Sequence, residues 1–155
     1  MDKDRLNRWL TLGANLGVLV GIILLILELD QNREMMRAQT RNEISVGIVD
    51  LLSQVATDTQ LAGLIRRADS GEDLTPDEYV QYEHRSAAMF RYFENVHYQY
   101  RLGLYDEAEF SKQKEAWRSY FARAKTGAAI WCDYRETTSA QFMAEIDSLL
   151  PTKSC

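Results

Sequence analysis

The stretch LTLGANLGVLVGIILLILELD, Leu10 to Asp30, decides how the fold of this chain begins and where the chain resides. Trp9 to Leu27 is an uncharged run of 19 residues. As an α-helix this run reaches roughly 28 Å, close to the roughly 30 Å thickness of bilayer hydrocarbon. A soluble helix of this length normally carries a polar stripe. The run therefore predicts a helix that spans a membrane.

The residues after the run predict that it is retained as an anchor. A secretory signal has a shorter apolar core and ends at a cleavage site made of small residues. Here large side chains and then charges follow, in the sequence LLILELDQNRE. We therefore expect a single-pass protein whose span has membrane lipid as its partner.

The charges beside the run leave its orientation open. The positive-inside rule compares the basic residues of the two flanks. The short N-terminal tail also carries two aspartates, so it could cross the membrane at small cost. The flanks hold three basic residues each, namely Lys3, Arg5 and Arg8 before the run and Arg33, Arg37 and Arg41 after it.

Two cysteines favour a cytoplasmic location for the domain after the span. A disulfide scaffold would need more than two cysteines in so short a chain. Cys132 is expected to be a small buried residue and Cys155 to lie in a frayed end. Two free thiols are typical of a reducing compartment, so we expect this domain in the cytoplasm.

Three glycines at every fourth position predict that the span associates with other helices. Gly13, Gly17 and Gly21 lie on one helix face, Glu28 lies close to it, and Asn15 lies roughly opposite. Small residues let two membrane helices approach closely. Two faces allow a ring, since a ring needs two interfaces per helix and a dimer needs one. The alternative is that the glycines reflect ordinary membrane composition and that Asn15 stays hydrated near the headgroups.

The rest of the chain predicts an acidic, all-α domain. The net charge is −5, and the acidic excess follows the span, which argues against a nucleic-acid surface. Asp58 or Thr57, Thr75 and Asp106 are expected helix starts, Asp30 to Asn32 is the most plausible bend, and Gly127 is an expected break. We divide the chain into residues 1–29 (tail and transmembrane helix), 30–57 (juxtamembrane helix) and 58–155 (helical bundle).

A polar group on the central helix is the candidate core site. Glu94 and His97 form an ExxH pair, and Tyr100 continues the same face. Di-iron bundles carry two such motifs, whereas this chain has one, so we expect no metal and no cofactor. His97 is expected to be buried and hydrogen-bonded to a tyrosine or to Glu94.

Two segments resemble a family of small bacterial proteins with no assigned activity. They are ELDQNREMMRAQT, just after the span, and FRYFENVHYQYRLGLYDEAEF, from Phe90 to Phe110. The resemblance covers most of the chain. It implies a bacterial membrane-anchored helical protein and transfers no catalytic residue and no substrate.

These observations favour a non-enzymatic protein of the bacterial inner membrane that forms a homo-oligomer. One alternative is an anchored sensor or enzyme that uses the Tyr/Glu/His-rich bundle. Another is a small pore, with Asn15 or Thr11 facing a lumen and Glu28 at its mouth. A third is an accessory subunit whose glycines face a helix of another membrane protein.

Overall fold

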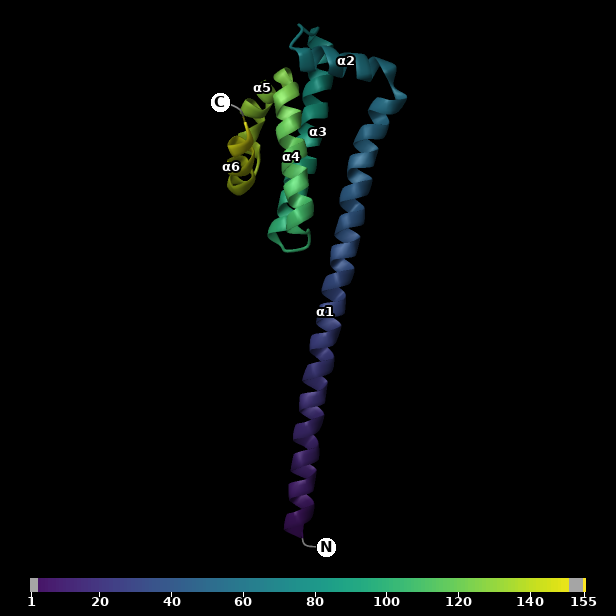
Figure 1. The fold of residues 1–155 in the computed structure, drawn as a ribbon, viewed down its shortest axis with the longest axis vertical. Helices are drawn as coiled ribbons and strands as arrows, with labels where there is room; N and C mark the ends of the chain where they lie inside the picture. The colour runs from purple at the N-terminus through teal and green to yellow at the C-terminus, as the bar shows by residue number, and fades with distance from the viewer. Residues whose placement is uncertain (1–2, 151–154) are drawn as a thin grey trace. The chain divides into compact units, whose positions relative to one another are not determined.

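The computed structural model describes residues 3–150 and residue 155. No β-strand lies among them, which confirms the all-α prediction. Contacts define two units, one ending at Gln39 and the other beginning at Thr40. The elements of the described chain (Figure 1) are α1 (Lys3–Thr57), α2 (Thr59–Ser70), α3 (Pro76–Arg101), α4 (Glu107–Arg123), α5 (Lys125–Tyr134), the 3-10 helix η1 (Arg135–Thr137) and α6 (Ala140–Leu149).

Helix α1 is one uninterrupted helix of 55 residues. The apolar segment therefore continues without a break into residues 30–57. The bend expected at Asp30 to Asn32 was wrong, because the helix is unbroken there. With no proline before Pro76, the backbone of this segment can keep its hydrogen bonds.

The first half of α1 exposes its apolar side chains on all sides. Leu16 is 62% exposed and Ile26 is 57% exposed. It is the helix of the described chain that is long and apolar enough to cross a membrane. Lipid is the solvent in which such a surface is stable.

Three helices of the second unit begin at capping residues that the sequence predicted. The Asp58 carboxylate accepts hydrogen bonds from two backbone N–H groups at the start of α2. Thr75 and Glu78 form a capping box at the start of α3, with Pro76 in the first turn. Asp106 caps α4 in the same way as Asp58 caps α2. These caps satisfy backbone donors that the helices leave unpaired.

Helix α3 is the centre of the second unit, as the sequence predicted, and it contacts α2, α4, α5 and α6. Figure 1 shows α3 and α4 side by side. Ile44 and Leu51 of α1 are buried in the same core, whereas Leu52 is 56% exposed. Half of the buried core cluster is aromatic, and its most deeply buried rings are Tyr82, Phe90, Phe93, Phe110, Trp117, Phe121, Trp131 and Phe142.

The break between α4 and α5 falls at Ala124, so the prediction that Gly127 ends a helix was wrong. Gly127 lies inside α5. A Cβ atom at this position would lie 2.8 Å from the Tyr120 hydroxyl oxygen and 3.2 Å from the Tyr82 hydroxyl oxygen. The glycine is there because two tyrosine hydroxyls approach its backbone closely.

Candidate functional site

Within the described part of the chain, no other segment packs closely against the glycines of the predicted seam. A Cβ atom built on Gly13, Gly17 or Gly21 would meet no atom within 4 Å. Asn15 and Glu28 are also exposed on α1. In the second unit, by contrast, a Cβ on Gly47 would lie 3.4 Å from the Tyr92 ring. The membrane glycines therefore leave open backbone, which is the surface that a second helix can approach.

Glu94 links α3 to the start of α6. One carboxylate oxygen lies 2.6 Å from Nη1 of Arg91. The other accepts a hydrogen bond of 2.8 Å from the backbone N–H of Ser139, the N-cap of α6. A carboxylate at a helix N-terminus is also stabilised by the helix dipole. Glu94 thus holds two elements of the bundle together.

His97 lies in an aromatic environment. Its ring centroid is 6.0 Å from that of Phe110 and 5.7 Å from that of Phe142. The side chain is 6% exposed, which confirms the predicted burial, and this burial lowers the pKa of the imidazole. The predicted hydrogen bond from His97 to a tyrosine or to Glu94 does not form among the described residues, and Glu94 bonds instead to Arg91 and to the Ser139 N–H.

Tyr100 contacts helix α4. Its ring stacks on Phe110 with a centroid distance of 3.9 Å, and its hydroxyl donates a hydrogen bond to Glu107 of α4. This hydrogen bond raises the pKa of the Tyr100 hydroxyl. The three predicted core residues therefore serve three separate contacts, and together they form no single site.

A second polar group, which sequence reasoning missed, lies where α2, α3 and α4 meet. The Tyr82 hydroxyl donates a hydrogen bond of 2.7 Å to Asp69. Ser86 is 1% exposed, and its hydroxyl lies near the Tyr120 hydroxyl of α4. The Arg85 Nε and Nη1 atoms are also buried, and neither has a hydrogen-bond partner among the described residues. Burial raises the pKa of Tyr82 and lowers that of Arg85.

These side chains line a cavity of about 30 Å³ together with Tyr120. That volume is close to the space occupied by one water molecule in the liquid. Tyr82 and Ser86 share one face of α3, which periodicity could have shown. Asp69 and Tyr120 come from other helices, so only the fold brings them to the same cavity.

A disulfide joins Cys132 of α5 to Cys155, so the prediction of two free thiols was wrong. Their Cα atoms lie 5.3 Å apart, within the range that disulfides require. Cys132 is only partly buried, and Cys155, expected to fray, is held at α5. The sequence signal was an even number of cysteines, and 23 residues separate the two. The fold supplies the proximity that sequence alone did not.

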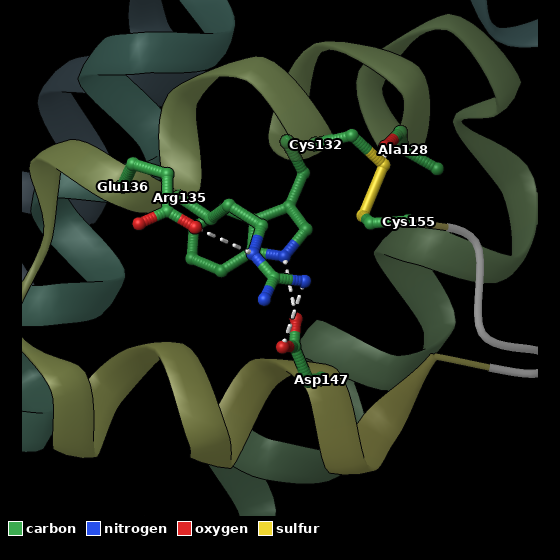
Figure 2. The surroundings of a disulfide bond; sticks show 7 residues. Ala128, Cys132, Arg135, Glu136, Asp147 and Cys155 are labelled. Carbon is green, nitrogen blue, oxygen red and sulfur yellow. Dashed lines mark hydrogen bonds and ion pairs between the residues drawn. A yellow bond between two sulfur atoms is a disulfide. The ribbon is translucent and has the colours of Figure 1, made fainter.

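Polar contacts surround this bond and fasten α6 to α5 and η1 (Figure 2). The Trp131 Nε1–H donates a hydrogen bond of 3.1 Å to Asp147 of α6. Arg135 of η1 pairs with the same carboxylate, with 2.9 Å between Nη1 and Oδ2. Because Trp131 is fully buried, its hydrogen bond to Asp147 fixes α6 to the core in addition to the disulfide.

No group of three His, Cys, Asp or Glu side chains that could hold a metal ion lies within residues 3–150 and 155. No family model, no characterised protein and no solved structure matches this chain.

Proposed function

We propose that this chain is a single-pass protein of the bacterial inner membrane that associates with copies of itself through Gly13, Gly17 and Gly21. The chain acts in this proposal as an assembling anchor for its acidic helical unit and not as an enzyme. The observation that carries the proposal is the open space around the three glycines. The resemblance to small bacterial membrane proteins is a further, sequence-based support.

The apolar surface of α1 explains insertion but not association. Lipid covers leucine and isoleucine side chains as well as a neighbouring helix does, so apolarity alone does not hold membrane helices together. Close packing of two helix backbones can hold membrane helices together, and it needs residues without large side chains. Gly13, Gly17 and Gly21 provide such a surface on one face of α1.

A homo-oligomer is favoured over association with a foreign helix because the same span also presents Asn15. A polar amide in hydrocarbon gains from a hydrogen-bonding partner, and a second copy of the same helix supplies an identical amide. Asn15 lies roughly opposite the glycines, so the two faces can serve two interfaces. Two interfaces per helix permit a closed ring, whereas the glycine face alone gives a dimer.

The test is the mass of the purified full chain in mild detergent. Gly17→Leu places a large side chain in the seam, and we expect it to shift the protein from oligomer to monomer. Val18→Leu enlarges a side chain away from the seam, and it should leave the mass unchanged. Asn15→Leu should reduce a ring to a dimer.

Two results would contradict the proposal. One is a wild-type protein that is monomeric at every detergent-to-protein ratio. The other is an oligomer that survives Gly17→Leu unchanged. A monomer that co-purifies in fixed ratio with a different membrane protein would instead support the accessory-subunit alternative.

A further inference from the structure

We infer that the helical unit after the span lies on the outer, oxidising side of the membrane, and that the residues before the span lie in the cytoplasm. This reverses the orientation expected from the sequence, which relied on two free thiols. The inference rests on the membrane span of the proposed function and not on self-association. The feature that carries it is the Cys132–Cys155 disulfide.

Other contacts also order the region of α5 and α6 around the disulfide. Helix α6 is fixed against α5 by Asp147, which bonds to both Trp131 and Arg135. Phe142 and Ile146 of α6 are fully buried in the core. Cys155 lies beside α5, where its sulfur atom meets that of Cys132 (Figure 2). Folding itself brings this cysteine pair together.

Such a pair is oxidised or reduced according to its compartment. Thiols in the cytoplasm are kept reduced by glutathione and thioredoxin, whereas disulfides form and persist in the periplasm and outside the cell. Both cysteines of the chain are used in this single bond. A bundle built with this bond therefore fits the oxidising side.

The charges beside the span do not oppose this orientation. Each flank holds three basic residues, so the positive-inside rule leaves the choice to other features. The excess of acidic residues after the span carries little weight in that rule. An N-terminal apolar segment can deliver the following domain outward either as a retained anchor or as a removed signal. The location of the bundle is thus independent of whether the span is cut.

Two measurements on the full chain in a Gram-negative host test the inference together. In the first, spheroplasts are treated with protease, and the bundle is followed with an antibody. In the second, free thiols are blocked in intact cells with N-ethylmaleimide, the protein is reduced, and newly freed thiols are labelled with a polymer-linked maleimide. We expect the full-length band to be lost to protease, and the blocked protein to gain two polymer labels.

Cys132→Ser and Cys155→Ser are the matched controls. Each leaves one thiol that the first blocking step caps, so each should gain no polymer label. A host without its exported thiol oxidase should give the wild-type protein without labels. Protection of the bundle in spheroplasts, or thiols already free before reduction, would overturn the inference. Loss of the anchor from membranes with an oxidised, protease-accessible bundle would contradict the membrane part of the proposed function and leave this inference supported.

Discussion

The two units of this chain use the same residue types under opposite conditions. Trp9 near the start of α1 is 71% exposed, while Trp131 in the bundle is fully buried. Gly13 has no neighbour within 4 Å of an added Cβ, while Gly127 has three neighbours at 3.2 Å or less. The bundle completes its packing within one chain. The first half of α1 keeps its apolar side chains exposed among the described residues.

The tryptophans give the largest expected difference. Trp131→Ala removes a ring that packs edge-to-face on Phe90 at a centroid distance of 5.2 Å and leaves Asp147 without its indole donor. The free energy of unfolding should fall by about 3 to 5 kcal/mol. Denaturant unfolding in detergent, followed by circular dichroism, measures it. Trp9→Ala should leave the unfolding of the bundle unchanged, and equal losses in the two variants would refute the distinction between the units.

Removal of the disulfide should have the next largest effect. Cys132→Ser with Cys155→Ser frees a loop whose ends are 23 residues apart. The expected loss is about 2 to 4 kcal/mol, because the cross-link limits the unfolded chain. Reduction of the wild-type protein should lower its melting temperature to that of the double variant. Since Asp147 still bonds to Trp131 and Arg135, we expect α6 to stay docked below the melting temperature.

The glycines give a smaller and sharper comparison. Gly127→Ala should cost about 1 to 3 kcal/mol through overpacking against the tyrosine hydroxyls, which exceeds the roughly 0.5 to 1 kcal/mol that alanine gains over glycine in a helix. Gly13→Ala should leave the bundle unaffected and act, if at all, on the oligomer. Near-ultraviolet circular dichroism during thermal unfolding separates the two. A Gly127→Ala protein as stable as wild type would mean that the tyrosines can move aside.

The smallest effect concerns pH. Burial lowers the pKa of His97 in the folded protein, so the unfolded chain takes up a proton first as pH falls. The stability that neutral His97 contributes is fully present above the ordinary histidine pKa of about 6.5. It is lost as pH drops through the lower pKa that His97 has in the folded protein. His97→Asn should therefore flatten the fall in stability between neutral and mildly acidic pH. The opposite slope, with His97 stabilising at low pH, would contradict the assigned burial.

Local rules explain what could be predicted from the sequence. The starts of α2, α3 and α4 depend on Asp58, Thr75 and Asp106 and on the backbone within three residues of each. The uncharged run is equally local. These features can be predicted without knowing the fold, and each correctly indicated a helix.

Contacts between distant segments explain what could not be predicted. Gly127 was predicted to end a helix, but it is a glycine because Tyr82 and Tyr120 pack closely against it. These tyrosines lie on two other helices, so the local sequence does not show the contact. The cavity beside Arg85 needs α2, α3 and α4 to meet. The disulfide needs the fold to place Cys155 beside α5. Glu94 and His97 share a helix face, yet Glu94 bonds to the Ser139 N–H at the start of α6, a partner 45 residues away in the sequence.

The Cys132–Cys155 bond has one further consequence, for exchange between neighbours. Proteins that crowd side by side on a membrane are at risk of domain swapping, in which copies trade an equivalent element. Helix α6, a short terminal element of the bundle, is the natural one to trade. A covalent bond from the chain beyond α6 to α5 of the same copy closes that route. Copies joined through their spans would then keep their bundles separate.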